Sequence, residues 1–242
     1  MVWKMTKGPI MKKLLCGALM MVGALVVAPT VSNATVISFD FTTLGSNNTP
    51  LANSVTVNGI KASGFGPYSG TPAPLWLRNQ TNDHGLGVCS EGAPACSTGG
   101  GDVNELDNLG VNEAILLENT NGGSWISLWV SSLDGGDADN VESGQLFWSN
   151  SLVFSAANSF TFSFGAFGAS VEGDILTLAQ ASSFVSSAHY LLFQANPGSG
   201  YGNDYLVWKG QVSVPEPMTL GLLGTGLIGI ALFMRRGKMG EG

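Results

Sequence analysis

The sequence predicts an all-β chain folded as an antiparallel β-sandwich of jelly-roll type, and three observations lead to this fold class. Short apolar and β-branched runs recur along the central part of the chain. Every gap between those runs contains Gly, Asn, Asp, Ser or Pro, as turns require. No convincing helical period interrupts the pattern, and the 34 glycines disfavour helix further. Many short strands with such spacing are typical of a two-layer sandwich.

The expected strands follow one another from residue 36 onward, and each is bounded by turn residues. In the fourth of them, Ile126, Leu128 and Val130 alternate with Trp125 and Trp129. A period of two places the tryptophans together on the face opposite the aliphatic residues. The expected strands span residues 36–41, 54–60, 113–118, 125–131, 146–148, 159–164, 175–178, 190–193 and 205–212.

Trp125 and Trp129 are therefore a candidate ligand-binding pair. Exposed tryptophan rings stack on sugar rings, so two of them on one sheet face would form a carbohydrate-binding platform. The alternative is that both belong to the core, where most tryptophans of a sandwich lie.

The first segment of the chain has the pattern of a secretory signal peptide. Four lysines precede the apolar run 14–28, and the small residues Ser32-Asn33-Ala34 follow it. This order predicts a signal peptide over residues 1–34 with cleavage after Ala34. The run is too short, and wrongly flanked, for a transmembrane helix of the mature protein.

The C-terminal segment predicts a membrane anchor over residues 214–238. Val214-Pro215-Glu216-Pro217 precedes an uncharged run, residues 218–234, which predicts a transmembrane helix. Seventeen residues of helix rise about 25 Å, near the lower limit for a hydrocarbon core of about 30 Å. The basic residues after it, Arg235, Arg236 and Lys238, predict a cytoplasmic stop segment over 235–238. Residues 35–213 then form one exported domain on the outer side of the membrane.

This ordered tail resembles the PEP-CTERM sorting signal, in which a Pro-Glu-Pro motif, a hydrophobic helix and an arginine-rich stop are recognised by exosortase, a membrane cysteine transpeptidase. The residues that carry the resemblance are Pro215, Glu216, Pro217, Arg235 and Arg236. It implies export, transient anchoring in the inner membrane, cleavage near the motif, and delivery to the cell surface or exopolysaccharide matrix of a Gram-negative bacterium. The same tail is also labelled an ice-binding protein C-terminal domain, which implies nothing about ice here. The alternative is an ordinary single-pass anchor.

The cysteine content agrees with export, and the charge of the domain excludes some classes of binding partner. Residues 35–214 contain three cationic side chains against fifteen anionic ones, a formal charge of −12. Nucleic acid and anionic lipid are therefore not expected partners, since they require clustered Lys and Arg. Cys89 and Cys96 predict a disulfide in an oxidising compartment, with free thiols as the alternative. The two histidines complete no zinc-binding spacing.

Two acidic sets are candidate calcium sites, because hard cations prefer carboxylate and carbonyl oxygens. A polar strand edge and a solvated hairpin tip are the respective alternatives. The first set is Asp102, Glu105 and Asp107, and the second is Asp134, Asp137, Asp139 and Glu142.

No catalytic residue is expected. Glu105 and Asp107 fit the start of the Glu-x-Asp motif of one class of jelly-roll glycoside hydrolases, but Leu109 or Gly110 stands where the second glutamate is required, and Glu113 lies too far along the segment to take its place. The sequence therefore predicts a non-catalytic adhesion or matrix-binding module with exosortase, the inner membrane and exopolysaccharide as partners. The alternative is a carbohydrate-active enzyme on the same scaffold.

Overall fold

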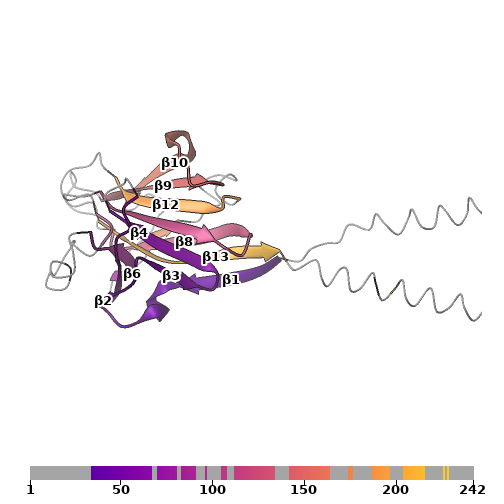
Figure 1. Cartoon of the computed structure of the whole chain (residues 1–242), viewed down its shortest axis with the longest axis horizontal. Coiled ribbons are helices and arrows are strands. Elements are labelled where there is room, and N and C mark those ends of the chain that lie inside the picture. The colour runs from indigo at the N-terminus through magenta and orange to yellow at the C-terminus, as the bar shows by residue number, and fades with distance from the viewer. Residues whose placement is uncertain are drawn as a thin grey trace, which may run out of the picture. The chain divides into compact units, whose positions relative to one another are not determined.

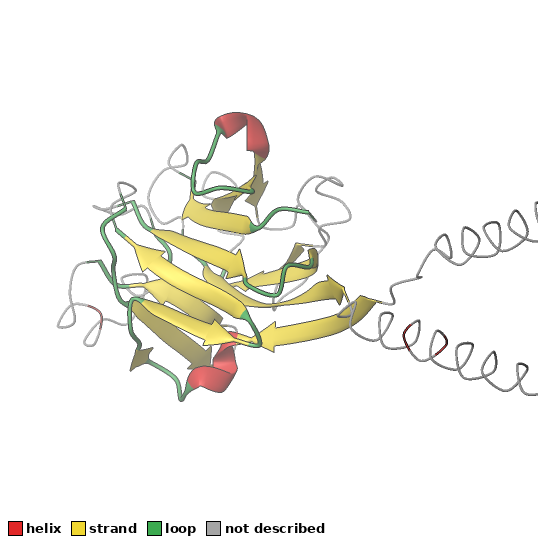
Figure 2. Cartoon of the chain, turned by 45° about the vertical axis from the view of Figure 1, so that its right-hand side comes forward, coloured by secondary structure: helices red, strands yellow, loops and turns green. Residues whose placement is uncertain are grey.

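Strands make up most of the regular structure, as Figure 2 shows. The computed structural model describes residues 34–66, 70–80, 83–90, 96, 105–107, 112–133, 142–163, 174–176, 187–196, 204–215, 226 and 228. Ala34–Pro215 forms one compact unit. Within the described residues the strands form two antiparallel sheets, so the predicted all-β class is confirmed. The jelly-roll topology stays a prediction.

The larger sheet contains seven strands among the described residues, in the order β11-β8-β13-β6-β5-β2, with β1 paired to β13. The 3-10 helix η1 (Phe41–Leu44) follows β1 and begins where the Asp40 side chain accepts a hydrogen bond from the Thr42 N–H. The strands are β1 (Ala34–Asp40), β2 (Thr49–Pro50), β5 (Leu75–Gln80), β6 (Asp83–Val88), β8 (Ser124–Ser131), β11 (Asp174–Leu176) and β13 (Leu206–Pro215).

The smaller sheet contains six strands, again among the described residues, in the order β10-β9-β12-β7-β4-β3. A second 3-10 helix, η3 (Ala156–Asn158), leads into β10. The strands are β3 (Ser54–Val57), β4 (Ile60–Phe65), β7 (Ala114–Asn119), β9 (Ser143–Ser149), β10 (Ser159–Ser163) and β12 (Tyr190–Ala195).

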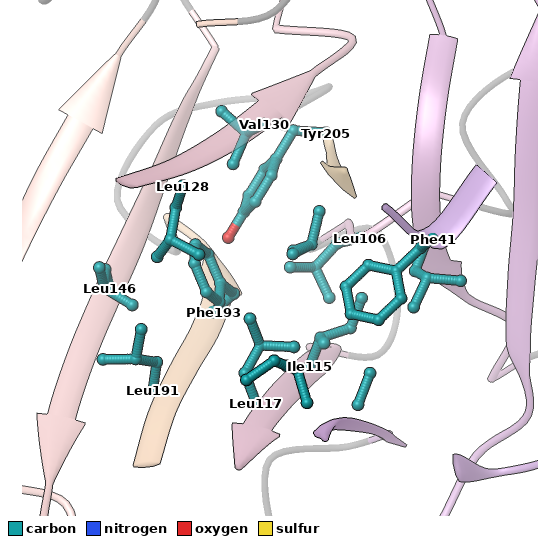
Figure 3. Packing of buried hydrophobic residues seen from close by; sticks show 14 of the residues in the cluster. Phe41, Leu106, Ile115, Leu117, Leu128, Val130, Leu146, Leu191, Phe193 and Tyr205 are labelled. Atoms are coloured by element: carbon teal, nitrogen blue, oxygen red, sulfur yellow. The ribbon is translucent and has the colours of Figure 1, made fainter. Parts of the chain in front are cut away.

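One hydrophobic core lies between the two sheets. Leu128 and Val130 from β8 and Leu117, Leu191 and Phe193 from the smaller sheet are fully buried in the same cluster. Figure 3 shows these side chains gathered around a common centre. The shared core is what holds the two sheets face to face, since each sheet must bury its apolar face against another element.

Two parts of the strand prediction differ from the structure. The run 54–60 is a hairpin, because Asn58 and Gly59 take positive φ values of 49° and 77° and reverse the chain between β3 and β4. β5 and β6 lie outside the predicted runs. β5 ends in the polar residues Arg78-Asn79-Gln80, and β6 begins with Asp83-His84 and contains two glycines, so only short apolar stretches mark either strand in the sequence.

β13 is the central strand of the larger sheet, and its partner changes along its length. One edge pairs with β8 from Leu206 to Ser213. The other edge pairs with β6 at Val207 and with β1 from Lys209 onward. The register shifts between Val207 and Lys209, which leaves Trp208 as the extra residue of a bulge. Figure 1 shows β1 and β13 side by side, with β1 beginning where β13 ends.

Candidate functional sites

One arginine and three acidic residues are all buried, and we call these four residues the carboxylate cluster: Arg78, Glu105, Asp107 and Glu113. Arg78 on β5 contacts Asp83 through Nη2, and its Nη1 lies 2.7 Å from Glu105 Oε1. Arg78 is only 8% exposed and Glu105 3%. Asp83 also accepts a hydrogen bond from the Ser132 hydroxyl at 3.1 Å. Glu105 thus contacts the guanidinium group of a buried arginine.

Segment 105–107 extends the larger sheet in the manner of a short strand. The Val88 N–H donates to the Glu105 carbonyl at 3.4 Å, and the Leu106 N–H donates to the Tyr205 carbonyl at 2.9 Å. Leu106 belongs to the core, while Glu105 faces Arg78. Glu105 and Asp107 are both buried.

Glu113 lies beside Asp107 in the folded chain, although six residues separate them in sequence. The Glu113 N–H donates to the Asp107 carbonyl at 3.2 Å, and the Asp107 N–H donates to Glu113 Oε2 at 3.4 Å. Glu113 Oε1 accepts from the Ser90 N–H at 2.9 Å. Burial, followed by the negative charge of Asp107, raises the pKa of Glu113 from 4.5 to about 9. Glu113 is therefore protonated at neutral pH.

The predicted calcium sites find no support in the part of the chain that the structure describes. No group of three or more His, Cys, Asp or Glu side chains there is arranged to hold a metal ion. Asp102 lies outside the described residues, as do Asp134, Asp137 and Asp139, and Glu142 of that second set is half-buried. Calcium binding by either set stays a prediction.

The predicted disulfide between Cys89 and Cys96 is confirmed. The two Cα atoms lie 6.0 Å apart, and both side chains are buried against Trp76. The Trp76 indole N–H donates to Asn48 Oδ1 at 2.7 Å. Trp76 and the disulfide form a small cluster apart from the main core, which secures the chain after β6 to the side of β5 that carries Trp76.

Trp125 and Trp129 do not share a sheet face, and this prediction is wrong. Gln211 pairs with Ser127 while Val212 pairs with Trp125, so Ile126 is an extra residue on β8. The bulge reverses the alternation at that point. Trp125 enters the core at 2% exposure, and its indole N–H donates to the Ala188 carbonyl at 2.8 Å. The proposed two-tryptophan platform is therefore not formed.

Trp129 instead belongs to a strip of half-buried side chains that the sequence did not predict. Lys209 is its cross-strand partner on β13. The Lys209 ammonium lies 5.8 Å from the centre of the Trp129 ring and 3.7 Å from that of Trp208. The His84 ring stacks on Trp208 with 4.8 Å between ring centres. We call these four residues, which all lie outside the hydrophobic core cluster, the aromatic strip.

The backbone explains how the strip assembles. Leu128 and Gly210, the neighbours of Trp129 and Lys209, both face the core, and Gly210 lies against the Phe39 ring. Trp129 and Lys209 therefore point away from it. Gly85 lets β6 cross close to β13, because a Cβ on this residue would lie 2.5 Å from the Val207 carbonyl oxygen. This close approach brings His84 onto Trp208.

The first residues of the predicted sorting motif belong to the folded domain. Val214 and Pro215 are the last residues of β13, and Pro215 pairs with Ala34, the predicted cleavage residue of the signal peptide. Glu216, Pro217, Arg235 and Arg236 lie outside the described residues. Among the residues that are described, no helix is both long enough and apolar enough to cross a membrane.

Comparison with known proteins bears on the C-terminal segment. Residues 213–236 match the PEP-CTERM protein-sorting motif. No curated protein and no solved structure matches the chain. The motif confirms the resemblance predicted from the sequence, and it indicates an exported protein that is targeted to exosortase and sorted to the cell surface.

Sequence reasoning missed Arg78, His84, Trp208 and Lys209. The sequence did contain one indication for Arg78: residues 35–214 have only three cationic side chains against fifteen anionic ones, and Arg78 is one of the three. A lone cation in so acidic a domain is a candidate for a buried ion pair. The same indication exists for Lys209, but not for its contact with Trp208 or for the stacking of His84 on Trp208, because these depend on a bulge and a strand crossing.

Proposed function

We propose that this exported, exosortase-targeted protein is a non-catalytic binding module of the cell surface or exopolysaccharide matrix, and that its aromatic strip binds polysaccharide. The observation that carries the proposal is the pairing of Trp129 with Lys209 on the side of the larger sheet away from the core. An indole ring offers an apolar surface to a sugar ring, and an ammonium group donates to hydroxyl or carboxylate oxygens.

The net charge of the domain limits how acidic a bound polysaccharide would be. With a formal charge of −12 over residues 35–214, the domain repels a dense polyanion at low ionic strength. Lys209 supplies a local cation, and ring stacking on Trp129 does not depend on charge. A polysaccharide with sparse acidic groups suits this surface better than a uniformly charged one. Divalent cations held by the loop 134–142 would assist binding to an acidic chain.

Binding is tested with the purified full chain and two matched polymers, neutral dextran and acidic polygalacturonate, by affinity electrophoresis. We expect Trp129→Ala to weaken binding roughly fivefold, the equivalent of about 1 kcal/mol of lost stacking. Trp129→Phe retains a ring and should retain most of the affinity. Lys209→Gln should weaken binding of polygalacturonate more than that of dextran. Wild-type protein that binds neither polymer, or Trp129→Ala protein that binds like wild type, would contradict the proposal.

Delivery to the surface is tested separately in the native host, by fractionation and intact mass. Wild-type protein should appear outside the inner membrane without its tail. A variant with Pro215, Glu216 and Pro217 replaced by alanine should remain full-length behind Ala34 in the inner membrane. Equal retention of both proteins would mean that the tail is only an anchor.

The alternative function is a carbohydrate-active enzyme, and one observation favours it. Glu113 is protonated beside Asp107, and a carboxylic acid next to a carboxylate is the pairing used in glycoside hydrolysis. Against it, Glu113 and Asp107 are each only 1% exposed. Release of reducing ends from either polymer by wild type, and its loss in Glu113→Gln, would favour the enzyme over the binding module.

A further inference from the structure

The chain around the sorting motif is held in strand pairing up to Pro215. We call residues 213–215 the junction segment. On one edge, Ser213, Val214 and Pro215 pair with Val36, Thr35 and Ala34 of β1. On the other edge, Ser213 pairs with Ser124 of β8. The junction segment is therefore an extension of the central strand of a sheet.

Packing adds to the strand pairing. Gly123 lies so close to the junction segment that a Cβ on it would be 1.9 Å from the Ser213 carbonyl oxygen and 2.9 Å from Val214 Cα. The Val214 side chain packs against the hydrophobic core. Pro215 is the first exposed residue along this stretch of β13. Within the junction segment, Ser213 and Val214 are half-buried and only Pro215 is exposed.

Strand pairing restricts what a processing enzyme can reach. Proteases commonly bind substrates as extended segments through the backbone groups of the substrate, and β1 and β8 already occupy those groups in the junction segment. β8 contributes at Ser213 only, whereas β1 pairs with all three residues, so cleavage before Pro215 would first require β1 to detach. We propose that β1 shields the junction segment, so that sorting breaks a peptide bond on the C-terminal side of Pro215.

The chemical step is an acyl transfer, and this inference rests on the proposed sorting by exosortase. The amide C–N bond after Pro215, Glu216 or Pro217 breaks. The acyl carbon stays with the domain and passes to water or to an amine acceptor, while the tail leaves with a new amino group. The folded domain would then keep the whole of β13, and with it Lys209 and Trp208 of the strip.

Cleavage of the signal peptide would leave the new N-terminus in β1, the strand that pairs with the junction segment. Cleavage after Ala34 makes Thr35 the new N-terminus, and Thr35 pairs with Val214. The first strand of the mature protein is therefore also the cover of its sorting junction. While both targeting segments are attached, they leave the domain from paired residues, Ala34 and Pro215.

Shielding is tested on the full-length protein in detergent by digestion with proteinase K and intact mass of the resistant core. The wild-type core should end at Pro215 or later. Val36→Pro/Ile37→Pro removes two consecutive β1 N–H donors, one of which faces β13 in a regular strand. Cuts within 209–214 should then appear roughly tenfold faster. The control Val36→Ile/Ile37→Val keeps the β-branched side chains and should match wild type.

A wild-type core that ends before Ser213, or a proline variant with the wild-type core, would overturn the inference. If the proline variant does not fold and loses its whole core, a second variant, Val36→Cys/Ser213→Cys, still tests the inference. Its disulfide links an existing cross-strand pair. In the host, the linked protein should be processed to the same C-terminus as wild type, at residues 215–217. Failure of the linked protein to be processed, where each single cysteine variant is processed, would show that β1 must detach.

The same host experiment separates this inference from the sorting proposal. If the tail is never removed, sorting itself fails, and the digestion still decides whether β1 covers the junction segment. If the tail is removed but the mature domain ends within 209–214, sorting stands and the inference falls.

Discussion

The carboxylate cluster and the aromatic strip are both polar regions next to β6, but they differ in access to water. Arg78, Glu105 and Glu113 are at most 8% exposed and contact one another or the backbone of neighbouring loops. Trp129 and Lys209 are half-buried and outside the core. Buried charges must be satisfied within the protein, whereas half-exposed groups remain open to a ligand. We therefore expect substitutions in the cluster to change the stability of the domain, and substitutions in the strip to change ligand binding.

The largest test of this comparison is Arg78→Ala. Removal of the guanidinium leaves Glu105 buried without its cation, and breaking a buried ion pair costs about 3–5 kcal/mol. The free energy of unfolding from urea titration should fall by that amount. Lys61→Ala, which removes a half-buried cation of the smaller sheet, is the control and should change it by less than about 1 kcal/mol. Equal effects of the two changes would contradict a structural role for the cluster.

Loss of the disulfide should have the next largest effect. Cys89→Ala/Cys96→Ala frees a loop with a sequence separation of 7, for which chain entropy predicts a loss of roughly 2–3 kcal/mol. Exposure of Trp76, now packed on the disulfide, should also shift its fluorescence to longer wavelength. Polysaccharide binding by the folded fraction should remain, because the disulfide packs on Trp76, which is not part of the strip.

Glu113 makes a pH-dependent contribution of predictable sign. Its pKa is about 9 in the folded protein and 4.5 as an ordinary carboxyl group, so the folded state binds this proton more tightly. The contribution is complete below about pH 4.5 and is lost as pH rises toward 9, so stability falls across that window. Glu113→Gln should flatten the fall in free energy of unfolding measured from pH 5 to 9. An unchanged slope would contradict the raised pKa.

Lys209→Met should have the smallest effect on stability, within about 1 kcal/mol, because the ammonium is half-exposed and its contacts are with ring faces. Thermal unfolding at pH 7 measures it. A loss as large as that of Arg78→Ala would place Lys209 with the cluster and weaken the case for a binding surface.

Local sequence pattern predicted what depends on neighbours along the chain. The all-β class, most strands, the disulfide and the sorting motif all follow from composition, periodicity or short motifs. The prediction from regular alternation was wrong at Trp125, because Ile126 is an extra residue in β8 and its insertion places Trp125 in the core. The contact of Glu113 with Asp107, and that of His84 with Trp208, depend on how strands pass over one another. Such contacts leave no period in the sequence.

The pairing of Ala34 with Pro215 was likewise invisible in the sequence, since 181 positions separate the two residues. Each end was assigned to a separate targeting segment by its own local signals. The fold places them together because the first and last strands of the domain are neighbours in the larger sheet.

The position of β13 also determines how the domain would carry mechanical load. Its C-terminal end leads to the sorting tail, and Trp208 and Lys209 of the strip lie on the same strand. Tension between a surface attachment at Pro215 and a polymer bound at Lys209 would run along the backbone of this single strand. Because both points lie on one strand, the covalent backbone of β13 would carry the tension, and the pairing with β1 and β8 would keep that stretch extended. The hydrophobic core and the smaller sheet would carry little of the force.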